Sequence, residues 1–381
     1  MVGQAGQAFR RWRLGLAVLA AVALLAVGAT VVVRLAAGVG PQRGPGTTNT
    51  TAAVTPSAAE PSPTPSPTPS PTPPPGAGIT GPLNLLLVGV DTRVSVPGWE
   101  PHGDAVLVAH VTKELDRAYL FSLPRDLLVD IPAYPESGYR GGRTKLTHAM
   151  SYGSRVPGKR RQPSTAQGYE LLRSTVSGYT GLRFDAGAVV TFQGFDKLVD
   201  AVGGIDLYVD QRTPSLHRRP DGRHRAPAPG GGGYVGPQMV YEKGERHLNG
   251  WQALDYARQR YIPGGDYTRQ RHQQQLIRAL LRRIQAEDLA RQPERVEQVV
   301  AALGDTLTYA GGPRVVDLAY ALGGLPADRL VLVGLPGDSV GSGGGYRGEQ
   351  LTRVGRGFLT ALRAGRADEY LADHPELVVK K

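Results

Sequence analysis

The stretch Leu83-Asn84-Leu85-Leu86-Leu87-Val88-Gly89-Val90-Asp91 decides the fold. Its almost unbroken apolar character predicts a strand that is buried on both faces, at the centre of a sheet covered by helices. Asp91 follows directly, at the carboxyl end of that strand. The stretch therefore indicates an α/β protein and places a charged side chain at one edge of its sheet.

Two further strands are predicted after this one, over residues 105–111 and 117–123. If the three strands form a meander, the chain direction alternates from each strand to the next. The carboxyl ends of the first and third strands then lie at the same edge as the amino end of the second. Asp91, Asp104 and Arg125 would share that edge.

Two carboxylates brought this close repel each other unless a proton or a cation lies between them. Asp91 and Asp104 offer only oxygen ligands, which favour a hard cation such as Mg²⁺. A purely structural alternative stays open at this point. In it the two aspartates cap turns or pair with Arg93 and Arg125.

The middle of the chain supplies scaffold. It predicts a helix over residues 166–176, a strand over 184–192, a helix over 194–202 and a strand over 205–209. Lys145 and His148 fall in a polar loop before the first of these helices, where Lys145 alone is typical of a solvated lysine. Residues 211–236, rich in Arg, His, Pro and Gly, predict a long surface loop. That loop is either a solvated insertion or a contact for polymer or cell wall.

A pair of arginines follows the next predicted helix. Asn249 is a good N-cap for a helix that ends near Ala257. Arg258 and Arg260 stand two residues apart, so an extended segment after the helix would direct both side chains to one side.

A long amphipathic helix is predicted to begin at Asp266 or Thr268. Its apolar stripe, followed backward, continues into Gln273 and then Arg269. These two polar residues therefore fall on the buried face where the helix begins. Arg271 points away and is predicted to be solvated.

Four arginines are thus predicted to converge near two aspartates. A buried guanidinium without a partner costs several kcal/mol, so the group needs anions. A planar guanidinium matches phosphate oxygens, and an arginine cluster beside a carboxylate-held Mg²⁺ is typical of phosphoryl transfer. A structural Arg/Asp network remains the alternative. The four are Arg125, Arg258, Arg260 and Arg269.

Composition limits the classes of function. The 381 residues include no cysteine, which excludes a disulfide scaffold, thiolate catalysis and zinc–cysteine or iron–sulfur centres. The net charge of +11 calls for an anionic partner. Three of those units lie on residues 1–13 and one on residues 34–82, which leaves seven on residues 83–381.

The N-terminal part predicts a membrane anchor and a stalk. Residues 14–33 carry no charge and are long enough to cross a bilayer, which favours an uncleaved signal-anchor over a cleaved signal peptide. The arginines before the span favour a cytoplasmic N-terminus and an exported domain, an arrangement that disfavours nucleic acid as the partner. The predicted organisation is a tail at 1–13, a span at 14–33, a Pro/Ser/Thr-rich linker at 34–82, a catalytic domain at 83–366 and a C-terminal tail at 367–381.

These residues resemble the LytR–CpsA–Psr (LCP) family, whose members attach glycopolymers to bacterial peptidoglycan. The resemblance covers Leu83 to Arg283 and continues more loosely toward Arg366. The order and spacing of the motifs carry it. They are Leu86-Leu87-Val88-Gly89-Val90-Asp91-Thr92-Arg93, Gly103-Asp104-Ala105, Ser122-Leu123-Pro124-Arg125-Asp126, Lys145-Leu146-Thr147-His148-Ala149, Val199-Asp200-Ala201-Val202-Gly203-Gly204-Ile205-Asp206, Ala257-Arg258-Gln259-Arg260-Tyr261 and Asp266-Tyr267-Thr268-Arg269 with Gln273-Gln274.

The resemblance implies an αβα sandwich around a mixed central β-sheet, with a pocket that holds a polyprenyl chain. It implies Mg²⁺, or Mn²⁺ in its place, on Asp91 and Asp104. Arg125, Arg258 and Arg260 would be catalytic and bind the pyrophosphate. The other implied pyrophosphate ligands are Arg93, Lys145, Arg269 and Gln273, and Asp126 and Asp266 are candidates for the general base.

The implied reaction is attack by a peptidoglycan sugar hydroxyl on the sugar-side phosphorus of a polyprenyl-pyrophosphate-linked glycopolymer. A phosphodiester forms and polyprenyl phosphate leaves. The glycopolymer could be of teichoic acid, arabinogalactan or capsular type. The sequence departs from the family at His102-Gly103-Asp104-Ala105, where Arg-Ser-Asp-Thr is common, and at Thr268 and His272, where Gly and Arg are frequent.

Two other functions are compatible with parts of the sequence. Residues 337–341 fit the G-x-S-x-G pattern of serine hydrolases, with Ser339 as nucleophile and Asp373 and His374 downstream. A nucleophile elbow needs a helix directly after the serine, however, and glycines follow here instead. The other rival is a non-catalytic, membrane-tethered binder of anionic wall polymer, which would have no need of the Asp91/Asp104 pair.

Overall fold

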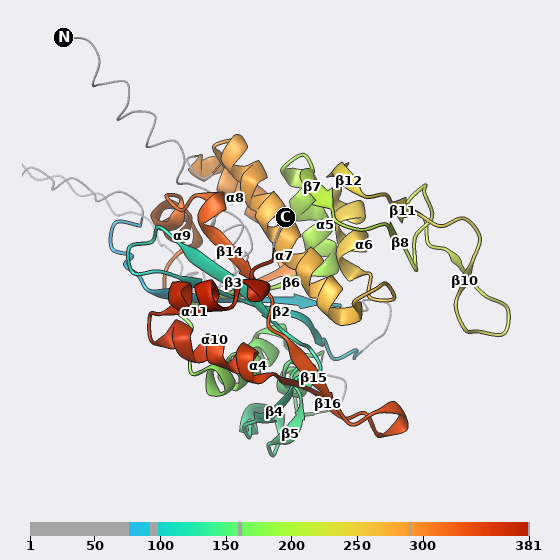
Figure 1. The fold of residues 1–381 in the computed structure, drawn as a ribbon, viewed down its shortest axis with the longest axis horizontal. Coiled ribbons are helices and arrows are strands. Elements are labelled where there is room, and N and C mark those ends of the chain that lie inside the picture. Colours follow the sequence, from blue (N-terminus) through green and yellow to red (C-terminus); the bar gives the residue numbers. More distant parts are fainter. Residues whose placement is uncertain (1–75, 92–97, 159–161, 290–291, 380–381) are drawn as a thin grey trace, which may run out of the picture. The chain divides into compact units, whose positions relative to one another are not determined.

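The central strand predicted from the sequence is β1, Leu83–Val90, of a six-stranded sheet. The computed structural model describes residues 76–91, 98–158, 162–289 and 292–379, all in one compact unit (Figure 1). The strand order is β13-β6-β1-β2-β3-β14. The other five strands are β2 (Gly103–Val111), β3 (Ala118–Leu123), β6 (Ala186–Thr191), β13 (Leu307–Gly311) and β14 (Leu330–Val333).

The sheet is mixed, and the predicted meander is correct. β2 runs antiparallel to both β1 and β3. β6 pairs with the other edge of β1 in parallel, and β14 pairs with β3 in parallel. β13 is antiparallel to β6 and closes the far edge.

Helices cover both faces of the sheet. β1 sends Leu85 and Leu87 into one core cluster and Leu86 and Val88 into the other, because successive side chains of a strand point to opposite faces. The first cluster is completed by α5 (Phe192–Ala201), α6 (Gly250–Arg258), α7 (Gly265–Ala286), α8 (Pro293–Leu303) and α9 (Val315–Leu322). The second is completed by α3 (Thr147–Ser154), α4 (Thr165–Thr180), α10 (Arg353–Arg363) and α11 (Ala367–Asp373). The result is the three-layer αβα arrangement around a mixed sheet that was predicted.

A two-stranded ribbon packs against α7, and its two strands are joined by a long connection. The ribbon pairs β7 (Ile205–Val209) with β12 (Gly244–Leu248). Residues 210–243, called the arm below, connect these two strands and extend away from the helices (Figure 1). The arm, which includes the segment predicted as a surface loop, contains short antiparallel ladders. They pair β8 (Thr213–Pro214) with β11 (Val240–Tyr241), and β9 (Ala226–Pro227) with β10 (Tyr234–Val235).

Two more small ribbons and several short 3-10 turns complete the described elements. The ribbons pair β4 (Leu128–Ile131) with β5 (Gly142–Lys145), and β15 (Gly337–Val340) with β16 (Gly348–Leu351). The turns are η1 (Pro135–Ser137), η3 (Gly304–Thr306), η4 (Ala327–Arg329), η5 (Gly343–Gly345) and η6 (Pro375–Leu377).

The predicted long helix is confirmed as α7, which begins at Gly265, one residue before Asp266. Two local predictions were wrong. The polar loop expected around His148 is the helix α3, which packs against α4. Residues 367–379 are not a tail: Ala367, Leu371 and Leu377 are buried in the second core cluster.

The predicted membrane span and most of the predicted linker fall outside the described residues. Within the described ranges, no helix has the length and apolar character needed to cross a bilayer. Residues 14–33 and 34–75 are not among them, so the anchor and the stalk stay predictions.

Candidate active site

The sheet edge brings together the residues that chain direction predicted. Asp91 directly follows β1, and Arg125 lies two residues beyond the end of β3. Asp104 lies at a shift in register between β1 and β2, because Gly89 pairs with Ala105 whereas Val90 pairs with Gly103. Such a bulge leaves one residue without a partner and redirects its side chain.

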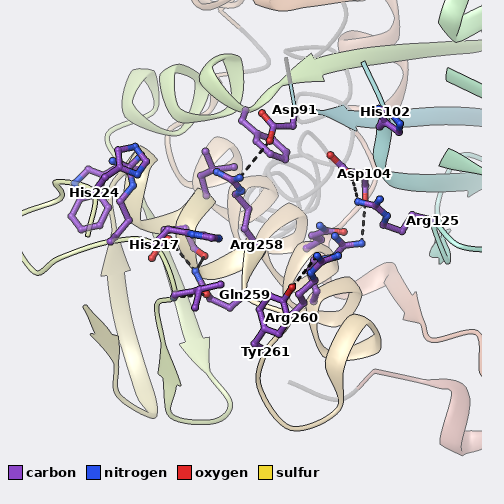
Figure 2. Close-up of a pocket in the computed structure, with 18 of the residues that line it drawn as sticks. Asp91, His102, Asp104, Arg125, His217, His224, Arg258, Gln259, Arg260 and Tyr261 are labelled. Atoms are coloured by element: carbon purple, nitrogen blue, oxygen red, sulfur yellow. Dashed lines mark hydrogen bonds and ion pairs between the residues drawn. The ribbon is translucent and has the colours of Figure 1, made fainter. Parts of the chain in front are cut away.

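Each aspartate lies beside an arginine. Arg125 donates a hydrogen bond from Nη1 to Asp104 Oδ1. Arg258, the last residue of α6, places Nη2 3.6 Å from Asp91 Oδ2 and stacks its guanidinium 4.3 Å from the centroid of the Phe192 ring. Figure 2 shows both pairs, with the two aspartates on the same side of the arginines.

Arg269 is the most buried of the predicted arginines, with 6% of its surface exposed. Nη2 lies 2.7 Å from Asp266 Oδ1 and donates a 3.0 Å hydrogen bond to the main-chain carbonyl of Asp104. Nε is buried and has no hydrogen-bond partner among the described residues. Burial lowers the pKa of Arg269, because the charged form is poorly solvated there. A buried cation with an unused donor is well placed to receive an anion.

A cavity of about 780 Å³ lies over these residues. Its lining carries more positive than negative charge: five arginines against three aspartates. Gln273, predicted on the same helix face as Arg269, also lines it. The positive residues are Arg125, Arg218, Arg258, Arg260 and Arg269, and the negative residues are Asp91, Asp104 and Asp255.

An apolar groove adjoins the cavity between the sheet and helices α5, α6 and α7. Its volume is about 90 Å³. Residues found in the groove but not in the cavity include Leu87, Leu107, Val190, Phe195, Leu276 and Ile277. The cavity and the groove share Phe192, Leu254, Arg258 and Gln273 in their linings, so one opens beside the other at Arg258.

Three predicted site residues lie outside the cavity lining. Lys145 Nζ is 3.5 Å from Asp126 Oδ1, and the same ammonium lies 4.7 Å from the centroid of the Tyr346 ring. Asp126 is also 3.7 Å from Arg125 Nε, and Asp266 is paired with Arg269. The two candidate bases are therefore engaged in ion pairs beside the cavity. Arg93 lies outside the described residues.

The prediction that Arg271 is merely solvated was wrong. Arg271 donates a 2.7 Å hydrogen bond from Nε to Asp210, the first residue of the arm. The next residue, His272, is fully buried, places Nε2 3.1 Å from the same carboxylate and stacks on Tyr256. These contacts attach the arm to α7.

Sequence reasoning missed the contribution of the arm. Leu216, His217, Arg218, His224 and Tyr234 all line the cavity. Burial, together with the neighbouring positive charges of Arg258 and the arm, lowers the pKa of His217. The basic composition of residues 211–236 was the only signal for this role, and it did not distinguish a cavity wall from a solvated insertion.

The serine hydrolase alternative is contradicted by the structure. Ser339 lies within β15, where it pairs with Glu349 of β16 in an antiparallel ribbon. A nucleophile elbow requires a sharp turn from a strand into a helix at that serine. The segment after β15 is instead a glycine-rich turn, Gly341 to Gly345, that leads back into β16.

The two aspartates fit one mode of magnesium binding. The described residues hold no cluster of three or more His, Asp or Glu side chains suited to a metal. Mg²⁺ is often held by only one or two carboxylates, with the substrate's phosphate oxygens and water completing the coordination. Asp91 and Asp104 line one cavity and supply that number of carboxylates.

Comparison with known proteins identifies the family. The sequence profile of the LytR_cpsA_psr family matches residues 47–343. The chain is 29% identical over 210 residues to biofilm regulatory protein A of Streptococcus mutans, a stretch that covers 54% of this chain and 45% of that protein. It is 27% identical over 265 residues to the polyisoprenyl-teichoic acid–peptidoglycan teichoic acid transferase TagU of Enterococcus faecalis, covering 68% of this chain and 73% of the relative. For TagU of Bacillus cereus the identity is 27% over 203 residues, covering 53% and 52%.

Solved structures show the same fold. Bacillus subtilis TagV superimposes with a TM-score of 0.55 at 20% identity, over 76% of this chain and 98% of that one. A Streptococcus agalactiae protein superimposes with the same TM-score at 23% identity, over 76% and 87%. The chain spans about half the length of two of the curated relatives named above, and the profile match spans most of the chain. This protein belongs to the LytR_cpsA_psr family.

Proposed function

We propose that this protein transfers a glycopolymer from a polyprenyl pyrophosphate carrier to peptidoglycan through a phosphodiester, with release of polyprenyl phosphate. One observation carries the proposal: the arginine-lined cavity and the apolar groove share four residues and meet at Arg258. A ligand that fills both must combine an anionic group with a hydrocarbon chain. A polyprenyl pyrophosphate has that chemistry.

The charge balance of the cavity supports an anion of high charge. Asp255 accepts hydrogen bonds from Ser215, Tyr241 and Gln259, so its oxygens make no direct ion pair with the arginines at the cavity surface. Arg260 is exposed and has no carboxylate partner among the described residues. Each planar guanidinium group can bind two phosphate oxygens, and several such groups in one cavity suit the many oxygens and high charge of a pyrophosphate.

The proposed step forms one P–O bond and breaks another. The acceptor hydroxyl oxygen attacks the sugar-side phosphorus, the bond from that phosphorus to the bridging oxygen breaks, and polyprenyl phosphate leaves. Arg125, Arg258 and Arg260 would stabilise the charge that develops on the phosphoryl oxygens, which is the main means of catalysis in phosphoryl transfer. The proton of the acceptor hydroxyl needs a base, and Asp126 and Asp266 stay candidates that would have to leave their ion pairs.

Asp91 and Asp104 would hold Mg²⁺, or Mn²⁺ in its place. When bound, the metal would neutralise charge on the pyrophosphate oxygens. Arg258 Nη2 stands 3.6 Å from Asp91 Oδ2, beyond ordinary hydrogen-bonding distance, so that carboxylate is not tightly engaged by the arginine. We also propose that the predicted span at residues 14–33 holds the domain on the outer side of the cell membrane, where peptidoglycan is found.

The full-length protein, a polyprenyl-pyrophosphate-linked glycan, peptidoglycan fragments and Mg²⁺ together test the proposal. Asp91→Ala should abolish formation of the phosphodiester product. Asp206→Ala serves as the control, because that aspartate on β7 is 69% exposed and pairs with His247 outside the cavity. Transfer that survives Asp91→Ala would rule out this chemistry and favour a non-catalytic binder of wall polymer.

A further inference from the structure

The arm forms one wall of the cavity, although most of its length is exposed. Five of its residues contribute to the lining: Leu216, His217, Arg218, His224 and Tyr234. Both faces of a typical inserted loop would be in water. Here the first part of the arm instead lies beside Arg258 and Gln259, as Figure 2 shows for His217. The arm thus belongs to the site as much as the sheet edge does.

A buried polar network holds the arm to the helix that carries Arg258. Asp255 of α6 accepts hydrogen bonds from Ser215 Oγ at 3.0 Å and from Tyr241 at 2.9 Å. Gln259 accepts a 2.9 Å bond from the main-chain N–H of Leu216. Asp255 lies in α6 three residues before Arg258, and Gln259 directly follows Arg258 at the end of this helix. Their hydrogen bonds therefore fix the position of the start of the arm relative to Arg258.

The same network orients the two residues that follow. The main-chain N–H groups of His217 and Arg218 both donate to Ser215 Oγ, at 3.2 and 2.9 Å. Arg218 donates from Nη1 to the carbonyl of Gly222 at 2.8 Å, which holds the guanidinium at the cavity. Asp196 and Asp255 lie near enough to interact with its charge, but no carboxylate of the described residues forms a direct ion pair with it.

The arm as a whole is basic. Residues 211–236 contain five arginines and one aspartate, so a net charge of +4 lies on 26 residues. The pKa of His217 is lowered by burial and then by Arg258, His224, Arg218 and Arg260, and burial followed by Arg218 and Arg258 lowers that of His224. These imidazoles stay neutral near pH 7, so the positive charge of this wall comes from its arginines.

Aromatic rings accompany the arginines. The exposed ring of Tyr234 stands edge-on to the His217 ring, with centroids 5.1 Å apart. Gly222 lies against the indole of Trp251, where a Cβ would come within 3.1 Å of Cε2. Sugar rings pack their C–H faces against aromatic rings of this kind, which combine a broad apolar face with a polar edge.

We propose that the arm binds an anionic saccharide, the part of the donor glycopolymer next to the pyrophosphate, with Arg218 on its negative group and Tyr234 and Trp251 against its sugar rings. This inference rests on the proposed function. With the lipid in the apolar groove and the pyrophosphate at Arg258, the saccharide attached to that pyrophosphate enters the remaining space of the cavity, and the arm lines it. Specificity for the polymer would then lie in the arm, apart from the residues that perform the transfer.

Binding to three lipid probes separates this inference from the proposed function. The probes are polyprenyl pyrophosphate without sugar, the same lipid with a neutral disaccharide, and the same lipid with a disaccharide that carries a phosphate group. Full-length protein in detergent micelles is titrated with each. Arg218→Gln should weaken the phosphorylated probe about tenfold and leave the other two unchanged. Tyr234→Ala should weaken both sugar-bearing probes and leave the sugar-free lipid unchanged.

Arg223→Gln is the matched control, since it removes an exposed arginine of the same arm that does not line the cavity. It should leave all three affinities unchanged. If Arg218→Gln and Tyr234→Ala leave every affinity unchanged, or weaken all three probes equally, the inference is overturned. Weaker binding of a soluble peptidoglycan fragment with unchanged donor binding would also overturn it, by assigning the arm to the acceptor. Failure of the wild-type protein to bind even the sugar-free lipid would instead overturn the proposed function.

Discussion

Arg269 Nη2 donates a 3.0 Å hydrogen bond to the main-chain carbonyl of Asp104, and so connects the first turns of α7 to the bulge in β2. The two residues are 165 positions apart in the chain. The contact sets the buried guanidinium beside the carboxylate edge of the sheet, although burial disfavours its charge. Burial of this cation costs desolvation free energy, so its charge contributes little to the stability of the fold. Such a buried cation is typical of a binding site.

Arg269→Met is expected to abolish pyrophosphate binding with only a modest change in the free energy of unfolding. The methionine fills a similar volume and removes the desolvation cost of the guanidinium. Its partner Asp266 is 24% exposed and can be hydrated. Titration calorimetry with pyrophosphate and thermal unfolding of the same samples would measure the two effects.

Arg271→Met is the control on the same helix. It removes the partner of Asp210, whose side chain is only 17% exposed, and should lower stability while leaving pyrophosphate affinity intact. A variant at Arg269 that binds pyrophosphate like the wild type would contradict the role of the buried guanidinium.

Asp255→Ala is expected to destabilise the protein and to loosen the arm. The substitution leaves two buried hydroxyls, on Ser215 and Tyr241, without their acceptor, and it removes one of the two acceptors of the Gln259 amide. Each unsatisfied group costs about 1–3 kcal/mol, so a total loss of about 3 kcal/mol is expected. Limited proteolysis should then cut within residues 210–243 at protease concentrations that leave the wild type intact.

Glu242→Ala provides the comparison, because its 3.2 Å pair with Arg212 joins two exposed side chains of the arm. Such a surface pair contributes about 0–1 kcal/mol. Equal protease sensitivity in the two variants would show that the buried network does not hold the arm.

The sheet and the carboxylate edge were predictable because both follow from local patterns. The apolar run of β1 and the alternation of chain direction were enough to place Asp91, Asp104 and Arg125 at one edge. The bulge that redirects Asp104 was not predictable, since it shifts register by one residue without a distinctive local composition.

Helix α3 was missed because its sequence has no clear apolar stripe. Its packing depends on two glycines instead: a Cβ on Gly153 would come within 2.7 Å of Leu171 Cβ, and one on Gly168 within 2.6 Å of the Met150 carbonyl oxygen. Close approach of α3 and α4 through these glycines is a tertiary property that a single sequence does not display.

The contacts of the arm and of Arg271 were not predictable for a related reason. Exposed composition dominates residues 211–236, whereas the contacts that fix them are made to Asp255 and Gln259, about 40 residues later. The partner of Arg271, Asp210, is similarly distant in sequence. Polar pairs between distant segments have no periodicity, so pattern analysis assigns such residues to solvent.

Asp196→Asn is expected to stabilise the protein above about pH 6 and not at pH 4. Burial raises the pKa of Asp196 to about 6, and its Oδ1 has no hydrogen-bond partner in the described structure. An unfolded aspartate titrates near pH 4. Between these values the folded state binds more protons than the unfolded state, so the wild type loses stability as pH rises from about 4 to 6.

The expected gain for Asp196→Asn at pH 8 is about 2 kcal/mol, after allowance for the partial exposure of the carboxyl group, and near zero at pH 4. Thermal or urea unfolding across this range would measure it. Asp305→Asn changes an exposed aspartate and should alter the pH dependence little. A gain of equal size at both pH values would show that the raised pKa is not its cause.

Ile277→Asn is expected to separate lipid binding from pyrophosphate binding. Ile277 is partly buried on α7, one turn beyond Gln273, and lines the apolar groove but not the arginine-rich cavity. An amide placed against a hydrocarbon chain without a hydrogen-bond partner costs about 1–3 kcal/mol, which predicts a tenfold or greater loss of affinity for farnesyl pyrophosphate. Inorganic pyrophosphate, which needs only the cavity, should bind as tightly as to the wild type.

Ile277→Val keeps the groove apolar and should change both affinities little. The asparagine variant could instead bind both ligands as tightly as the wild type does. The hydrocarbon chain would then not occupy this groove, and Arg258 would not be the point where lipid and pyrophosphate meet.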